Sequence, residues 1–145
     1  MIISFKEMNE EYANIIVSKD SIGNNKCYNI NHEPEDIDDL LEDSDGYEFF
    51  VSFIDEEIIG YIECYFEDEV LEVGMALLPE YISEGLGTDF VSQAVEYLVD
   101  YYEYAGEVIR SFVSVDDSRT IEVMERVGFN KIDTTKKWVE MELGV

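Results

Sequence analysis

The sequence predicts an α/β (mixed α+β) fold in which a central mixed, mostly antiparallel β-sheet is flanked by helices. Three segments between residues 47 and 78 are rich in β-branched and aromatic residues and are separated by short acidic turns, which is typical of an antiparallel meander. After Pro79, segments with apolar residues at helical spacing alternate with strand-like segments, which indicates a right-handed βαβ crossover. At 145 residues the chain has the length of one domain, so we expect residues 1–145 to form a single domain.

The first elements are a short strand and two helices. Residues 2–5 are strand-like, and a helix is expected to begin after Asn9, whose side chain can cap its first turn. The residues expected to face inward from this helix are Met8, Tyr12, Ile15 and Ile16. A second, short helix starts near Pro34 and carries an apolar stripe of Ile37, Leu40 and Leu41.

The remaining elements complete the order β-α-α-β-β-β-α-β-α-β-β. Strands are expected at 47–55, 58–66, 70–78, 107–115, 129–133 and 137–143, with tight turns at Asp55-Glu56-Glu57 and Glu67-Asp68-Glu69. Helices are expected at 88–104, ended by Gly106, and at 118–127, ended by Gly128. The strand at 107–115 should run parallel to the strand at 70–78, because a helix connects them. Trp138 is expected in the core of the final hairpin.

The charge of the chain is strongly negative and unevenly distributed. Nine basic residues face 35 acidic ones, for a net charge of −26. Residues 1–109 hold 28 acids and three bases, whereas residues 110–145 hold seven acids and six bases. Such a field disfavours nucleic acid and anionic membranes as partners and favours cationic ones, although solubility alone explains the acids equally well.

The cysteines, the start of the sequence and its hydropathy indicate a cytoplasmic protein. Cys27 and Cys64 are far apart and lack metal-ligand spacing, so we expect two reduced thiols and no metal site. His32 is a lone loop residue with no expected catalytic role. No apolar run approaches the roughly 20 residues of a membrane span, and the N-terminal residues do not resemble a signal peptide.

The stretch from residue 70 to residue 90 carries the strongest functional signal. A strand ends, a loop containing Gly85 and Gly87 turns, and a helix begins. Glycines let the backbone approach a ligand closely, and the free N–H groups of a helix start favour phosphate. Taken alone, the same pattern also fits a turn that merely needs glycine. It is neither a Walker loop nor a dinucleotide-binding fingerprint.

Two motifs resemble the GNAT superfamily of acyl-CoA N-acyltransferases. The segment from Glu72 to Thr88 is similar to its signature, in which a strand ends near Pro-Glu-Tyr and a Gln/Arg-x-x-Gly-x-Gly/Ala loop starts the central helix. The segment from Asp117 to Phe129 resembles the family's Asn-x-x-Ser/Ala-Ile-x-x-x-Glu-Lys-x-Gly-Phe helix. The order of strands and helices also matches, so the resemblance covers nearly the whole chain.

The resemblance implies acetyl-CoA as the acyl donor and assigns the residues that would bind it. The backbone of Ala76 and Leu77 would pair with the pantetheine arm. The backbone amides that would wrap the pyrophosphate belong to Ser83, Glu84, Gly85, Leu86, Gly87 and Thr88. Asp117 occupies the position of an asparagine that commonly touches the cofactor in the family. Arg119, Arg126 or Lys131 could neutralise the outer phosphate, or could be ordinary surface charges.

Several residues depart from the family pattern. Ile82 stands where Arg or Gln is usual and Glu84 replaces a frequent Lys, so we expect weaker cofactor binding. Met124 falls where many members carry a tyrosine acid, and Phe112 where some carry a catalytic glutamate. The general acid is therefore unassigned, with Ser114 and Ser118 as weak candidates.

The resemblance implies an N-acetyltransferase with Glu72 as general base, although Glu72 could equally be a solvated or salt-bridged strand residue. The expected acceptor is a primary amine of a cationic small molecule or of a basic protein or peptide. The acidic segment 33–45 falls where the family's first two helices border the acceptor site, and it also fits a solvated acidic helix face. The alternatives are an acyl-CoA-binding regulatory module without turnover and an acidic mimic of nucleic acid. A tyrosine cluster near the end of the central helix fits internal packing or a homodimer contact, and its members are Tyr97, Tyr101, Tyr102 and Tyr104.

Overall fold

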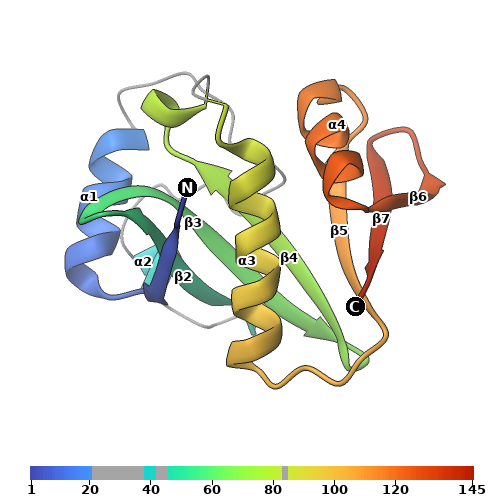
Figure 1. Cartoon of the computed structure of the whole chain (residues 1–145), viewed down its shortest axis with the longest axis horizontal. Coiled ribbons are helices and arrows are strands. Elements are labelled where there is room, and N and C mark those ends of the chain that lie inside the picture. The colour runs from blue at the N-terminus through green and yellow to red at the C-terminus, as the bar shows by residue number, and fades with distance from the viewer. Residues whose placement is uncertain (21–37, 42–45, 83–84) are drawn as a thin grey trace.

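The computed structural model describes residues 1–20, 38–41, 46–82 and 85–145 (Figure 1). Its strands are β1 (Ser4–Glu7), β2 (Glu48–Ile54), β3 (Glu57–Glu67), β4 (Val70–Leu77), β5 (Val108–Ser114), β6 (Asn130–Thr134) and β7 (Trp138–Gly144). Its helices are α1 (Glu10–Asp20), α2 (Asp38–Leu41), the short 3₁₀ helix η1 (Pro79–Tyr81), α3 (Gly87–Tyr101) and α4 (Ser118–Val127). The predictions concerning Cys27, His32, Pro34, Ile37, Ser83 and Glu84 lie outside the described residues.

The strands form one sheet with the order β1-β2-β3-β4-β5-β7-β6. The pair β4–β5 is parallel, and the other neighbouring pairs of described strands are antiparallel. The predicted fold class and the parallel crossover are therefore confirmed. The last strand along the chain, β7, lies between β5 and β6, so the final hairpin extends the sheet beyond β5.

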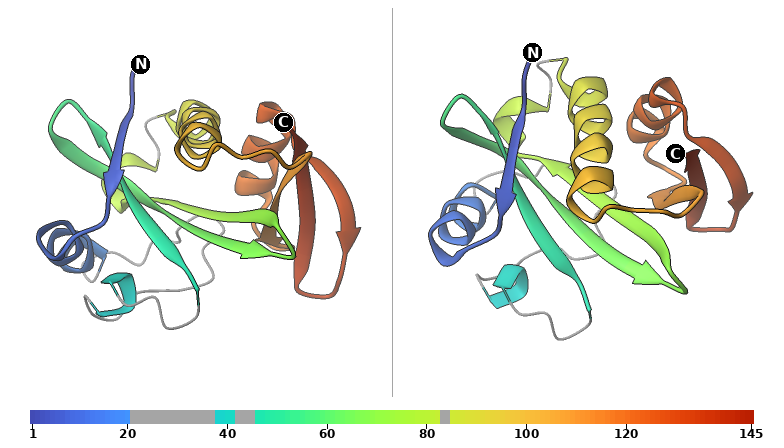
Figure 2. Two further views of the ribbon diagram at one scale, coloured as in Figure 1. Left: turned by 90° about the horizontal axis from the view of Figure 1, so that it is seen from below. Right: turned by 60° about the horizontal axis from the view of Figure 1, so that its bottom comes forward.

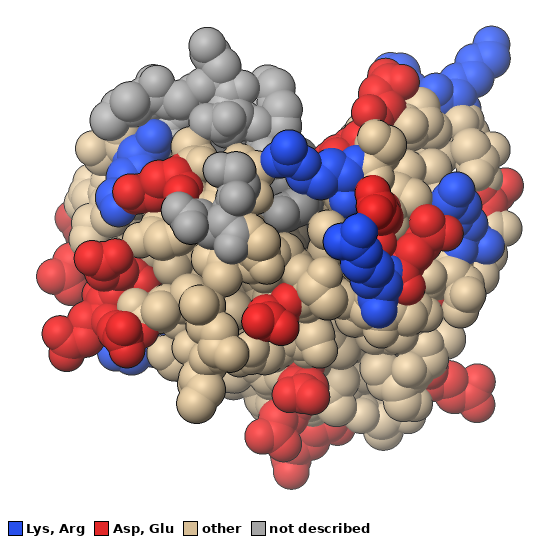
Figure 3. Space-filling view, turned by 45° about the horizontal axis from the view of Figure 1, so that its top comes forward, with Lys and Arg blue, Asp and Glu red and all other residues tan. Residues whose placement is uncertain are grey.

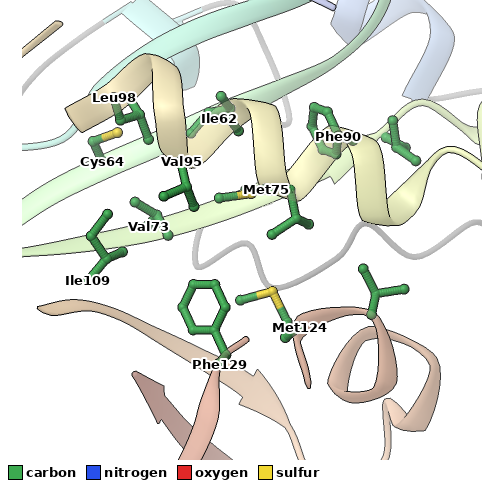
Figure 4. Close-up of a cluster of buried hydrophobic side chains, with 14 of the residues drawn as sticks. Ile62, Cys64, Val73, Met75, Phe90, Val95, Leu98, Ile109, Met124 and Phe129 are labelled. Carbon is green, nitrogen blue, oxygen red and sulfur yellow. The ribbon is translucent and has the colours of Figure 1, made fainter. Parts of the chain in front are cut away.

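Helices cover both faces of the sheet (Figures 1 and 2). Helices α3 and α4 lie on one face, where Phe90, Leu98 and Met124 pack against alternate residues of β3, β4 and β5. Met124 and Phe129 point toward Val73 and Met75 of β4 (Figure 4). Helices α1 and α2 lie on the other face, where Ile16 and Leu40 pack against the sheet. Within the described residues, no helix is long and apolar enough to cross a membrane.

Two of the apolar residues predicted to face inward from the first two helices are exposed. Ile15 is 38% exposed, whereas Ile16 is buried as predicted and Ala13, which was not predicted to face inward, is buried as well. Ala13 has a small side chain that brings the helix close to the sheet, and Ile15 lies about 100° around the helix from Ile16. In α2, Leu40 is buried, whereas Leu41 is 38% exposed. The cap predicted for α1 is confirmed, because Asn9 Oδ1 accepts a hydrogen bond from the N–H of Tyr12 at 2.9 Å.

The C-terminal end of α3 also differs from the prediction. The helix ends at Tyr101, well before Gly106, and Glu103 follows with a left-handed φ of 47°. Tyr104 holds this connection in place: its hydroxyl accepts from Leu71 N at 3.2 Å and donates to Val108 O at 2.7 Å. Gly106 is needed because an added Cβ would lie 2.2 Å from the Tyr104 hydroxyl. Gly106 therefore accommodates a tyrosine ring and does not end the helix.

The tyrosines of α3 and of the connection that follows it contact aromatic rings of the same chain, although Tyr101 is 41% exposed. Tyr97 stacks on Phe5 with ring centroids 4.9 Å apart, and Tyr102 meets Phe66 edge to face at 5.0 Å. Internal packing thus accounts for their clustering, and the homodimer stays a prediction.

Trp138, expected in the core of the hairpin, is 41% exposed. The reason is alternation along β7, in which Val139 and Met141 take the buried side.

Candidate active site

The two parallel strands β4 and β5 are joined at one end and separate toward the other. Their register pairs only Leu71 with Ile109 and Glu72 with Arg110. One residue further on, the Ser111 hydroxyl donates a 2.7 Å hydrogen bond to the carbonyl oxygen of Val73. Beyond this contact β4 and β5 diverge (Figure 1). The sheet is therefore split along the second half of β4, and the joined end forms its vertex.

The split leaves backbone groups of β4 directed away from β3. The hydrogen bond to Ser111 shows that the Val73 carbonyl is directed toward β5. Backbone groups two residues apart point to the same side of a strand, so those of Met75 and Leu77 are also directed toward the split. Ala76, assigned with Leu77 to the pantetheine arm, directs its carbonyl toward β3, where it would lie 2.2 Å from a Cβ at Gly60. An extended amide-bearing ligand can therefore add to β4 at Met75 and Leu77.

Helix α3 begins at the open end of the split. Leu86 is its N-cap residue and makes no side-chain capping bond, so the first N–H groups of the helix lack that partner. Gly85 has a φ of +76° and is exposed, with nothing within 4 Å of the position of a Cβ. Leu86 and Gly87 are buried and Thr88 is half-buried, so Gly85 is the exposed residue of this turn. Backbone amides at the positive end of a 15-residue helix suit an anion such as a pyrophosphate.

A charged cluster occupies the vertex of the split, on the face of the sheet that carries α1 and α2. We call Glu72, Arg110, Glu140 and Glu142 the vertex cluster. Arg110 Nη1 lies 3.9 Å from Glu72 Oε1, Arg110 Nε lies 3.2 Å from Glu140 Oε2, and Arg110 Nη2 lies 3.5 Å from Glu142 Oε2. These side chains are between 18% and 26% exposed, so water screens them only partly. One guanidinium thus faces three carboxylates.

The position of Glu72 in this cluster changes its acidity. Partial burial raises the pKa of the Glu72 carboxyl, Arg110 opposes this increase, and Glu67 and Glu140 add to it. A carboxylate with a raised pKa holds a proton more readily than an exposed one does. This property suits a group that must remove a proton from an amine near neutral pH.

The second motif places Asp117 at the start of α4. Its Oδ1 accepts from Thr120 N at 3.1 Å and its Oδ2 accepts from the Thr120 hydroxyl at 2.6 Å. These bonds cap the helix, which is the role visible in the structure.

The basic residues considered for the outer phosphate lie at the surface. Arg119 and Lys131 are exposed, and Arg126 pairs with Glu122 of the same helix. Most of the Lys and Arg side chains in view in Figure 3 gather on the side formed by α4 and the β6–β7 hairpin, and the surface is hollowed beside it.

The structure leaves the general acid unassigned. Met124 is fully buried in the core, and a thioether has no proton to donate. Phe112 is half-buried opposite Glu140. The Ser114 hydroxyl accepts from Asp116 N at 3.3 Å, and Ser118 is exposed. No side chain among these four positions is an evident acid.

Sequence reasoning missed Arg110, Glu140 and Glu142. A signal for them was present, since a charge between buried positions of a strand marks the opposite face. Arg110 lies between the buried residues Ile109 and Ser111, and Glu140 lies between Val139 and Met141. Their meeting could not be read from the pattern, because it depends on β7 pairing with β5.

Comparison with known proteins identifies the chain. The sequence profile described as the acetyltransferase (GNAT) family matches residues 18–129. The chain belongs to this family. The resemblance found in the two sequence motifs is therefore confirmed, and the chain is an acetyltransferase domain of the GNAT type, a family that uses acetyl-CoA.

One curated relative of this GNAT domain is the uncharacterized N-acetyltransferase MJ1207 of Methanocaldococcus jannaschii. The two are 26% identical over an alignment of 110 residues that covers 70% of this chain and 46% of the relative. The chain therefore spans about half the length of the curated relative that it matches.

Solved structures with the same fold include the spermidine N-acetyltransferase SpeG from Vibrio cholerae. Its complex with CoA and spermine has a TM-score of 0.75 and 16% identity, covering 98% of this chain and 95% of that chain. A chimera of the Vibrio cholerae enzyme and hSSAT has a TM-score of 0.73 and 15% identity, covering 98% and 95% of the two chains. At these identities the similarity shows the GNAT fold alone.

Proposed function

We propose that this GNAT domain transfers an acetyl group from acetyl-CoA to a primary amine of a cationic acceptor. The observation that carries the proposal is the split between β4 and β5, with the start of α3 at its open end and Glu72 at its vertex. Glu72 and Leu77 are five residues apart, roughly 16 Å along the strand at about 3.3 Å per residue. An elongated donor lying along β4 would therefore span from a phosphate-binding turn to a carboxylate.

The donor would be held mainly by backbone groups. The amides from Gly85 to Thr88, with those of Ser83 and Glu84 before them, would bind the pyrophosphate. The Leu77 and Met75 backbone would pair with the pantetheine arm. Main-chain binding explains how the chain can dispense with the Arg or Gln usual at Ile82, whose side chain packs against the core instead. Asp117 stays a proposed cofactor contact beside its capping role.

The acyl transfer needs one base. Glu72 would accept a proton from the acceptor ammonium, directly or through water, because an amine with a pKa near 10 is mostly protonated at neutral pH. The neutral nitrogen attacks the thioester carbonyl carbon, the C–N bond forms, and the C–S bond breaks as the sulfur leaves with its electron pair. The nitrogen gives up its second proton as the amide forms, and the departing thiolate or water takes it. A free thiol has a pKa of about 8.5, so the thiolate can leave without a strong acid. The buried Met124 is compatible with this chemistry.

The charge and shape of the vertex face favour a cationic acceptor. Three carboxylates face one guanidinium in the vertex cluster, which leaves an excess of negative charge at the split. On the same face, Phe112 lies opposite Glu140 and the exposed Trp138 lies opposite Ser114. Aromatic faces beside carboxylates attract ammonium groups. The complex of the related fold with CoA and spermine is compatible with this acceptor class.

The proposal is tested by thiol release from acetyl-CoA in the presence of spermidine, spermine, an aminoglycoside and a lysine-rich peptide. We expect thiol release with at least one of them, and a product that carries one acetyl group on a primary amine. CoA binding without thiol release on any acceptor would instead favour a regulatory module. An absence of CoA binding combined with tight association with basic proteins would favour a nucleic-acid mimic.

A further inference from the structure

We propose that Arg110 is the positioning residue of this site, holding the Glu72 carboxylate at the vertex and dividing its charge among Glu72, Glu140 and Glu142. The inference rests on the proposed function, because it gives Glu72 the role of base. Arg110 itself contacts neither donor nor acceptor in this proposal. It acts through Glu72.

The backbone fixes the guanidinium in the required place. Arg110 is the β5 partner of Glu72 in the parallel register and of Glu142 in the antiparallel register with β7. Its side chain is therefore at the last paired position before β4 and β5 separate. The three carboxylates come from two different strands on either side of β5, so no other described Arg or Lys occupies an equivalent position between them.

The distances indicate how the charge of Arg110 is divided. Glu140 and Glu142 lie nearer, at 3.2 and 3.5 Å, while Glu72 lies at 3.9 Å. Glu142 accepts a hydrogen bond from Arg110 Nη2, and Glu140 lies within ion-pair distance of Nε without a hydrogen bond, so these two carboxylates are the nearer partners of the guanidinium. Glu72 is oriented by the same cation but keeps carboxylate lone pairs for an incoming proton. A direct, bidentate pair with Arg110 would have made Glu72 a poor base, since such pairs stabilise the ionised form strongly.

The charged groups around Glu72 shift the pKa of its carboxyl in opposite directions. Arg110 favours its ionised form, whereas Glu140 of β7 and Glu67 of β3 favour its protonated form. Further titratable groups on the neighbouring strands are Tyr65, the β3 partner of Glu72, the buried Glu63 of β3, which lies opposite Gly74, and Glu142 of β7. Removing Arg110 and removing Glu140 should therefore change the proton affinity of Glu72 in opposite directions. A purely structural role for Arg110 predicts no such pair of effects.

The test compares Arg110→Gln, Arg110→Lys and Glu140→Gln, with Lys136→Gln as the control. Lys136 is exposed on the turn before β7, so its variant loses the same charge without touching the vertex cluster. Two quantities are measured in the full chain: the pH dependence of kcat/KM, and the titration of the Glu72 carboxyl by ¹³C NMR. The NMR titration can be recorded without turnover. Because Glu140→Gln retains Arg110, the proposal can still be tested if Arg110→Gln folds poorly.

We expect Arg110→Gln to lower kcat/KM at neutral pH roughly 10- to 100-fold, because the base is misplaced. The acid limb of its kcat/KM profile should move to higher pH, whereas that of Glu140→Gln should move to lower pH. Arg110→Lys should restore part of the kcat/KM that Arg110→Gln loses. Lys136→Gln should leave both measurements unchanged. The proposal would be overturned if the NMR titration of Glu72 were unchanged in Arg110→Gln and Glu140→Gln, or if it shifted in the same direction in both. Opposite NMR shifts with an unaltered pH–rate profile would show that Arg110 controls the protonation of Glu72 but would remove Glu72 as base, and with it the catalytic positioning role of Arg110.

Discussion

The two ends of β4 differ in which part of the chain faces the split. At the vertex, side chains dominate: Glu72 meets Arg110, which also contacts Glu140 and Glu142. At the open end, backbone dominates: Met75 and Leu77 direct main-chain groups toward the split, and Gly85 and the first turn of α3 lie beyond them. Under the proposed function, one strand would thus separate chemistry from donor binding. Substitutions at the two ends should have different kinetic signatures.

The largest effect is expected at the vertex, for Glu72→Gln. Loss of a general base lowers kcat by about 10²- to 10⁴-fold. The pKa of Glu72 is raised, so the wild-type enzyme should lose activity as the pH falls through that raised value, and the variant should lack this acid limb. The deficit should shrink at high pH, where more of the amine arrives deprotonated. The measurement is kcat against pH, and a wild-type-like profile would exclude Glu72 as base.

The same substitution should also alter the pH dependence of stability. A raised folded-state pKa means that the folded protein favours protonated Glu72. Its contribution to the free energy of unfolding is therefore complete below the unfolded pKa and is lost as the pH rises through the folded pKa. Urea unfolding across this range should be less pH-dependent in Glu72→Gln than in the wild type.

At the open end, Gly85→Asp should weaken CoA binding by about 100-fold or more. A side chain at a left-handed φ costs about 1–3 kcal/mol, a carboxylate repels phosphate, and each 1.4 kcal/mol is about tenfold in affinity. Gly85→Asn is the matched control, since it has the same shape without the charge and should bind better than the Asp variant. Calorimetric titration with CoA measures both. Wild-type affinity in Gly85→Asp would contradict the proposed position of the pyrophosphate.

Two substitutions of Asp117 should distinguish its role in helix capping from a role in cofactor binding. Asp117→Ala removes the acceptor of two hydrogen bonds from Thr120 and should lower the free energy of unfolding by about 1 kcal/mol in urea titrations. Asp117→Asn keeps a capping oxygen and removes a negative charge from the α4 start, so its CoA affinity should equal or exceed that of the wild type. Weaker CoA binding by the Asn variant would show that the charge itself assists binding.

The smallest effect is expected from Met124→Leu. Met124 is fully buried and fills space between α4 and β4, and a volume-conserving exchange costs less than about 1.5 kcal/mol. Because a thioether donates no proton, kcat at 25 °C should stay near the wild-type value. A large loss of kcat without a matching loss of stability would indicate that the thioether takes part in the chemistry.

Elements specified by local patterns could be predicted from the sequence. Helix α4 matches its predicted limits, since Asp117 caps one end and Gly128, with a φ of 121°, ends the other. The end of α3 could not be predicted, because tertiary bonds of the Tyr104 hydroxyl fix a chain reversal at Glu103, a residue that rarely adopts a left-handed conformation. For the same kind of reason, only Glu72 of the vertex cluster could be predicted. Glu72 lies within a motif, but Arg110 meets Glu140 and Glu142 only through pairing between distant strands.

The position of β7 has a consequence for the order in which the site is assembled during synthesis. Strand β5 pairs with β7 along its whole length, yet β7 is translated after every other described strand. Until residues 138–144 emerge, β5 keeps an unpaired edge, and Arg110 lacks the two nearer of its three carboxylates. The nascent chain can therefore build its helices and the β2–β4 meander early, while the electrostatic environment of Glu72 is completed last.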